Sequence, residues 1–183
     1  LVDLATLARP GLVRSLFANL VVATVMMATL VVGPFHLSRS LGLDAAAVGL
    51  ALSIGPVISA ATGVVAGGAV DRFGPEATVR AGLATMIVGA ALLAATADGF
   101  GLAGWVGGLA LLTPGYQLFQ AANTTGAMAD LPADRRGAVA GLLALARNLG
   151  LVSGAALMGT VFALTSGAVD AASAGAAEVT RGF

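Results

Sequence analysis

The sequence contains no cysteine and no lysine, and aromatic residues make up only 5% of its 183 residues. The absence of cysteine excludes disulfides and thiolate metal sites. Charged residues are also scarce at 10%, and the formal net charge is zero. We therefore expect no nucleic-acid partner, because binding to phosphates needs a concentrated basic patch.

The long apolar segments also lack aspartate and glutamate, and no glycine-rich loop carries a nucleotide-binding lysine. Paired carboxylates for acid/base catalysis, or for a carboxylate metal cluster, are therefore missing from these segments. ATP-driven transport by this chain is excluded for want of the phosphate-binding loop. We expect no enzyme activity, no cofactor and no metal site.

Apolar residues dominate what is present: 58% of the sequence is hydrophobic, with 26 glycines and a mean hydropathy of +0.96. A soluble domain of this length would need more polar surface to cover its core. The apolar residues form blocks long enough to cross about 30 Å of hydrocarbon as helices. We predict an all-α integral membrane protein in the lipid bilayer, with five transmembrane helices at about 16–37, 45–70, 81–97, 101–128 and 137–167.

The arginines predict the orientation, since positive residues in short loops stay on the cytoplasmic side. The polar tail 168–183 is too short for a sixth helix. With five helices, two arginines, Arg39 and Arg181, fall on one side of the membrane. The other side has six: Arg9, Arg14, Arg72, Arg80, Arg135 and Arg136. We therefore predict a cytoplasmic N-terminus.

The most informative motif is the polar turn GGAVDRFG at residues 67–74, between the second and third predicted helices. Gly67 follows Gly63 by four residues, and this Gly-x-x-x-Gly spacing favours close approach of a neighbouring helix. Asp71 and Arg72 stand at the membrane boundary, and Gly74 precedes a proline that turns the chain.

This turn resembles the cytoplasmic signature loop of the major facilitator superfamily, on the pattern Gly67-x-x-x-Asp71-Arg72-x-Gly74. In that family, the loop joins the second and third helices of a six-helix half and locks the cytoplasmic side. The family pattern continues with basic residues, whereas this chain has Pro75 and Glu76, a weakening typical of the second half of such transporters.

Three further segments resemble the C-terminal half of drug:proton antiporters in the same family: FQAANTT at 119–125, DRRG at 134–137 and ARNLG at 146–150. The chain begins at Leu1 without Met, and the resemblance implies that the N-terminal half and the last helix lie outside it. It also implies alternating access in a bacterial plasma membrane, with protons as the coupling ion and a small molecule as the substrate.

Polar side chains within the spans are the candidates for substrate binding. Gln117, Gln120 and Thr124 recur at a spacing that places them on one face of the fourth helix, with Asn123 beside them. Asn19, near the cytoplasmic end of the first helix, is placed at the same cavity. Polar groups at this depth avoid lipid, so they either line a water-filled cavity or hydrogen-bond to neighbouring helices.

A second set of residues is predicted to hold the cytoplasmic gate. Arg147 is the charged residue that lies well inside a span, and we favour a role in which it reaches the boundary and pairs with Asp130 or Asp134. A direct role in substrate binding or coupling is the alternative. The predicted gating set is Gly67, Asp71, Arg72, Gly74, Arg135, Arg136 and Arg147.

Two other functions are compatible with the same features. A sugar or metabolite transporter of this fold would favour more aromatic and charged residues in its cavity than the amides and threonine found here. A non-transporting membrane assembly subunit would need only helices with glycine-rich faces. Proton-coupled export of drugs or other amphipathic compounds is the function that the resemblance implies.

Overall fold

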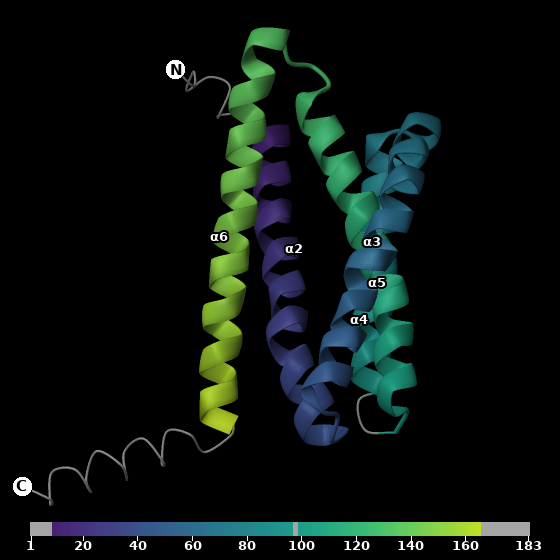
Figure 1. Ribbon diagram of the computed structural model, residues 1–183. Coiled ribbons are helices and arrows are strands. Elements are labelled where there is room, and N and C mark those ends of the chain that lie inside the picture. Colours follow the sequence, from purple (N-terminus) through teal and green to yellow (C-terminus); the bar gives the residue numbers. More distant parts are fainter. Residues whose placement is uncertain (1–8, 97–98, 166–183) are drawn as a thin grey trace, which may run out of the picture.

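The regular structure is entirely helical in residues 9–96 and 99–165, the ranges that this computed structural model describes. The chain therefore has the predicted all-α fold (Figure 1). Its elements are α2 (Pro10–Phe35), a short π-helix η1 (His36–Ser40), α3 (Ala45–Phe73), α4 (Pro75–Thr96), α5 (Gly101–Met128) and α6 (Ala133–Thr165).

The observed helices are longer than the predicted apolar spans at several ends, although α5 has the predicted bounds. α2 begins at Pro10, a residue that suits the first helical position because its missing N–H has no helical partner there. α4 begins at Pro75, where Glu76 and Arg80 form an ion pair of 3.1 Å. The prediction stopped each span at its charges, but a helical backbone continues beyond them. The tail 168–183 and the end of the fifth span lie outside the described residues.

Four of these helices, α2, α3, α4 and α6, are long and apolar enough to cross a membrane. α5 has a similar length of 28 residues, but its polar residues lower its hydropathy. Protein surrounds this helix, since α5 contacts α2, α3, α4 and α6. The described fold is thus a five-helix membrane bundle of the predicted class.

The helices pack as two groups, α2 with α6 and α3 with α4 and α5, and α5 also makes smaller contacts with the first group (Figure 1). α2 and α6 lie side by side and run in the same direction, as α3 and α5 also do. α4 packs against α5 in the opposite direction and makes the most extensive contact in the bundle. Gly74 is the single residue between α3 and α4, so the signature turn is very tight.

Glycines permit the closest helix contacts. A side chain at Gly115 in α5 would meet the carbonyl oxygen of Gly82 in α4 at 2.8 Å, and such a distance leaves no room for a methyl group. Gly89 and Gly108 have equally close neighbours across the same interface. Between α2 and α6, Gly150 lies directly against the backbone of α2. Small residues have this role in membrane helix packing, since association there depends on van der Waals contact.

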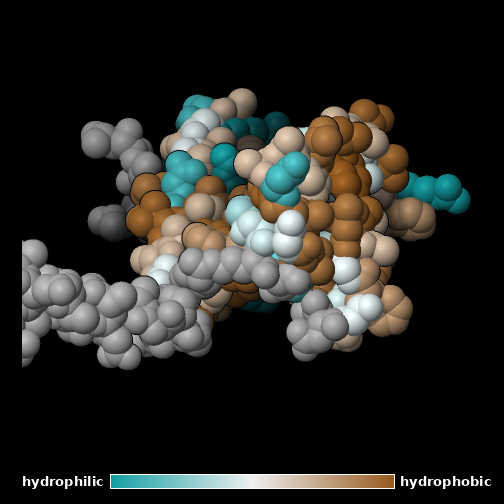
Figure 2. All heavy atoms as spheres, turned by 60° about the horizontal axis from the view of Figure 1, so that its bottom comes forward, coloured by the Kyte–Doolittle hydropathy of each residue, from teal (hydrophilic) through white to brown (hydrophobic). Residues whose placement is uncertain are grey.

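Large apolar side chains cover the outside of the bundle. Val64 and Leu50 of α3 are 84% and 72% exposed, and Phe17 of α2 and Val152 of α6 project to a similar extent. Figure 2 shows hydrophobic side chains over much of one face, with polar groups gathered in smaller areas. Such a surface suits lipid rather than water, and the chain is therefore a multi-pass membrane protein.

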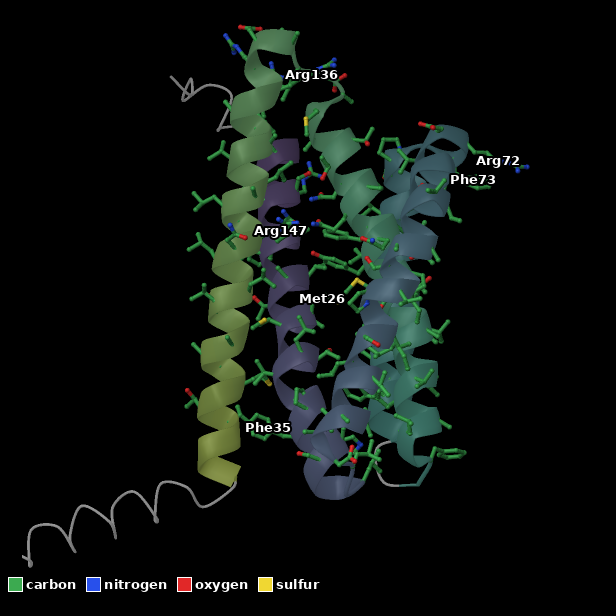
Figure 3. All side chains as sticks on the ribbon, viewed as in Figure 1. Met26, Phe35, Arg72, Phe73, Arg136 and Arg147 are labelled. Carbon is green, nitrogen blue, oxygen red and sulfur yellow. The ribbon has the colours of Figure 1, made fainter. Side chains whose placement is uncertain are left out.

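The arginines at the α3–α4 turn and in the first turn of α6 lie at the same end of the bundle, where Figure 3 labels Arg72 and Arg136. α2 also begins at this end (Figure 1). The predicted clustering of arginines at one end therefore agrees with the arrangement of the helices. The assignment of that end to the cytoplasm stays a prediction.

Candidate functional site

A pocket of about 180 Å³ lies between α2, α5 and α6. It is formed where three apolar helices each contribute a polar side chain, and it includes three of the predicted substrate-binding residues. Figure 3 shows Arg147, from the predicted gating set, about midway along α6. The lining residues are Asn19, Gln120, Thr124, Ala140, Leu143, Ala144 and Arg147.

Asn19 is buried and joins α2 to α6. Its side-chain Nδ2 donates a hydrogen bond of 2.7 Å to the carbonyl oxygen of Leu143. Its Oδ1 atom is buried without a hydrogen-bond partner among the described residues. A buried polar group without a partner costs about 1–3 kcal/mol, so this oxygen has an unmet requirement for a hydrogen-bond donor.

Gln120 and Thr124 bring α5 to the pocket, one helical turn apart. The Oε1 atom of Gln120 is a second buried acceptor that lacks a partner in the described part of the chain. The pocket therefore combines unpaired acceptors with the guanidinium donors of Arg147.

Arg147 does not pair with Asp130 or Asp134, and this expectation from the sequence was wrong. Within the described residues, Arg147 forms no ion pair with either aspartate. The ion pair found there joins Glu76 and Arg80. Thirteen residues separate Arg147 from Asp134 on the same helix, which is about 20 Å along the axis. That distance exceeds the reach of the two side chains. Arg147 lies beside the pocket rather than at the helix end.

Two other predicted substrate-binding residues lie outside this pocket. Gln117 turns toward α3, where its Nε2 donates hydrogen bonds to the hydroxyl and the carbonyl oxygen of Ser59. Asn123 is buried against α2 and donates a hydrogen bond of 3.1 Å to the carbonyl oxygen of Ser15. Both amides join helices, which is the alternative that the sequence left open. The predicted helical spacing is correct, but the residues of that face contact different neighbours: Gln117 meets α3, Asn123 meets α2, and Gln120 lines the pocket.

The signature turn depends on Gly74. Its φ of +79° lies in the left-handed region that side chains other than glycine rarely adopt. Its backbone N–H donates to the carbonyl oxygen of Val70 at 2.9 Å and so closes the end of α3. Buried Thr78 donates to the carbonyl oxygen of Gly74 at 2.8 Å, which joins the turn to α4. The turn is therefore a fixed structure that presents its flanking residues.

The charged residues of this turn are exposed at the end of α3. The guanidinium carbon of Arg72 lies 5.3 Å from the centre of the Phe73 ring, and Figure 3 shows Arg72 directed away from the bundle. A side chain at Gly67 would meet nothing within 4 Å in the described structure, and Gly63 has only the Gln117 amide at 3.9 Å. The expected close helix approach at these glycines is therefore not made by α2, α4, α5 or α6.

The other predicted gating arginines begin α6. Arg136 donates from Nε to the carbonyl oxygen of Leu131 at 3.0 Å, which closes the α5–α6 connection. The backbone N–H of Arg135 donates to Pro132. Figure 3 shows Arg136 and Arg72 at the same end but on separate parts of the bundle. The structure thus places the two predicted gating groups at one end without bringing them together.

Sequence reasoning missed a second, mostly apolar pocket of about 330 Å³ near the opposite end. His36 and Trp105 both line it, and their rings stack with centres 6.2 Å apart. His36 begins the π-helical turn that follows Pro34. The sequence signal was a single histidine two residues after a helical proline, but nothing in the sequence pairs it with Trp105.

Comparisons with known proteins agree with this geometry. Residues 3–173 match the Major Facilitator Superfamily. The chain is 29% identical over 127 residues to the multidrug efflux pump LfrA of Mycolicibacterium smegmatis, a match that covers 69% of the chain and 25% of that protein. It is 31% identical over 168 residues to the drug efflux pump JefA of Mycobacterium tuberculosis, over 92% of the chain and 33% of JefA.

The chain spans about a quarter to a third of the length of these relatives. No solved structure matches it. The family match covers most of the chain, and the described helices have the lengths and packing of a membrane bundle. The chain therefore belongs to the Major Facilitator Superfamily.

Proposed function

We propose that this chain is the C-terminal part of a drug-efflux transporter in a bacterial plasma membrane, and that it forms one wall of the substrate cavity. The observation that carries the proposal is the pocket between α2, α5 and α6, in which Asn19, Gln120, Thr124 and Arg147 face a shared space inside apolar helices. Polar and charged groups at this depth are costly and usually functional. The similarity to two efflux pumps supports small amphipathic compounds as the substrates.

Transport would follow alternating access, in which two halves of the full protein rock around a site near the middle of the membrane. Asp71, Arg72, Arg135 and Arg136 would close the cytoplasmic end by contacts with the other half. Their position supports this role, since all four belong to the ends of α3 and α6 at one end of the bundle. Asp71 is exposed, so its carboxylate is accessible to such a partner.

The packing also supports a missing sixth helix. α6 packs beside α2 as α3 packs beside α5, with each pair running in one direction. α4 adds an antiparallel neighbour to α5, while α2 has no matching neighbour among the described helices. A further helix on α2 would complete a pair of three-helix repeats, the internal symmetry on which many transporter folds are built.

Proton coupling requires a protonatable group in the transport path. Among the described residues, aspartate and glutamate lie at helix ends or in connections, away from the middle of the membrane spans. We therefore place the proton-carrying carboxylate in the N-terminal half of the full transporter, and the chain itself contributes substrate contacts and gate residues.

The test is export by the full-length protein in cells that lack their own drug pumps. Asp71→Asn and Gln120→Ala should each lower the export of a fluorescent amphipathic dye severalfold, while the amount of transporter in the membrane stays the same. Asp71 makes no ion pair within the described chain, so its loss should not unfold the bundle. Thr85→Ala is the matched control, since Thr85 is partly exposed, lies outside the pocket and uses its hydroxyl to bond only to Ala81 of its own helix. If both variants export like the parent, the proposed roles are wrong.

A further inference from the structure

Arg147 carries a charge that no described residue neutralises. It lies midway along α6, which runs from Ala133 to Thr165. It forms no ion pair within the described ranges. The described carboxylates lie at helix ends or connections: Asp44, Asp71, Glu76, Asp130 and Asp134. Arg147 is exposed on the described helices, and a charge at the middle of a membrane span needs a partner or a water-filled cavity, because lipid does not solvate it.

The orientation of the Asn19 amide is determined by its own hydrogen bond. Nδ2 lies 2.7 Å from the carbonyl oxygen of Leu143, and an exchange of the nitrogen and oxygen would set two acceptors against each other. Oδ1 is therefore an acceptor, and it is buried without a donor among the described residues. Asn19 is 3% exposed and lines the same pocket as Arg147.

These two unmet requirements are complementary. Arg147 lacks an anionic acceptor, and Asn19 lacks an N–H or O–H donor. A pocket of about 180 Å³ has room for a carboxylate and the atoms next to it. The remaining lining combines Gln120 and Thr124, which add polar atoms, with Ala140, Leu143 and Ala144, which suit the apolar atoms next to that group.

We infer that this pocket binds the polar end of amphipathic substrates that carry a carboxylate, with a hydroxyl or amide N–H beside it. The carboxylate pairs with Arg147 and the neighbouring donor binds Oδ1 of Asn19. This inference rests on the proposed transport function and specifies its substrate class. A cationic group is disfavoured at this position, because like charges repel more strongly in a medium of low dielectric constant.

The test uses the full-length transporter in inside-out membrane vesicles energised by a proton gradient. Three probes are compared: a fluorescent aromatic carboxylic acid with a neighbouring hydroxyl, its neutral N-methyl amide, and a cationic dye. Arg147→Gln should lower uptake of the acid about tenfold or more, since charge-assisted hydrogen bonds to carboxylates are among the strongest. Uptake of the amide should change less than twofold. Arg147→Lys should retain more uptake of the acid than Arg147→Gln.

Arg80→Gln is the matched control, because this arginine is exposed at the end of the bundle and lies outside the pocket. Immunoblots of the vesicles confirm equal amounts of each variant. An equal loss of acid and amide uptake in Arg147→Gln would overturn the inference and indicate a carboxylate of the protein as the partner of Arg147. Uptake of the amide and dye but not of the acid by the parent would overturn the inference and leave transport intact. A parent that transports none of the three probes would overturn the proposed function itself.

Discussion

α5 has two sides that use opposite means to hold their neighbours. Toward α4, Gly108 and Gly115 bring the two backbones together, with apolar side chains filling the rest of the contact. Toward α3 and α2, Gln117 and Asn123 reach across as hydrogen-bond donors. The polar side also continues into the pocket through Gln120.

The two sides of α5 therefore have different roles: the glycine side supports the fold, and the polar side lines the candidate site. The glycine side leaves no space for a ligand, and its contacts depend on exact shape. The polar side leaves acceptors unpaired at Asn19 and Gln120. Unpaired buried groups lower stability, so the presence of two such acceptors at one pocket favours a site that exchanges partners. Changes on the glycine side should therefore affect stability, and changes at the pocket should affect transport.

Gly115→Ala should cause the largest loss of stability. The added methyl group would lie 2.8 Å from the Gly82 carbonyl oxygen and 2.8 Å from the Met86 nitrogen. Both are backbone atoms, so α4 and α5 must separate. Overpacking of this kind costs about 1–3 kcal/mol. Unfolding of the purified full-length transporter in detergent, followed by circular dichroism, measures this cost.

Gly159→Ala is the matched control for that measurement. Gly159 lies in α6 and has nothing within 4 Å of an added methyl group. The same substitution should be neutral there, or slightly stabilising through helix propensity. Equal unfolding curves for the two variants would mean that the glycines do not determine the α4–α5 contact, and the comparison between the two sides of α5 would fail.

The fold was largely predictable because lipid imposes strong rules on sequence. Apolar runs of sufficient length identified all five helices, even though charges at Glu76 and Arg80 hid the first turns of α4. Gly74 and the following proline correctly marked a tight turn. Helix partners were harder to predict. The expected close approach at Gly67 is absent from the described contacts, while the close packing at Gly82 and Gly115 was not predicted.

The site was predictable only in its polar content. Helical spacing placed Gln117 and Gln120 on one face of α5, and the two are indeed separated by one turn. Spacing does not say which helix lies opposite each residue. Gln117 meets Ser59 of α3, whereas Gln120 meets the pocket. Arg147 was assigned to the gate from the nearest acids in sequence, but the rise of a helix carries them about 20 Å away.

Gln117→Ala should have a smaller effect on stability than Gly115→Ala and almost none on export. Gln117 joins α5 to α3 through Ser59, and hydrogen bonds between membrane helices contribute about 0.6 kcal/mol on average. A double-mutant cycle with Ser59→Ala, read by the same unfolding measurement, should give a coupling energy of about 0.5–1.5 kcal/mol. Dye export should remain near the parent value, in contrast to Gln120→Ala. Similar export losses in the two glutamine variants would place Gln117 in the transport path and remove the distinction between joining and binding residues.

Arg80→Gln should have the smallest effect on stability. It removes an exposed surface contact, in contrast to the close-packed glycines of α5. Its ion pair with Glu76 is 3.1 Å long, but the two side chains are 73% and 88% exposed. Water and salt screen such a pair, so its removal should change the free energy of unfolding by less than about 0.5 kcal/mol. The same unfolding measurement at low and at high salt should give values within that range, and export should be unchanged. If Arg80→Gln instead lowers export at equal stability, the α3–α4 turn contacts a partner through Arg80 as well as Asp71, and the gate extends further along α4 than the described contacts indicate.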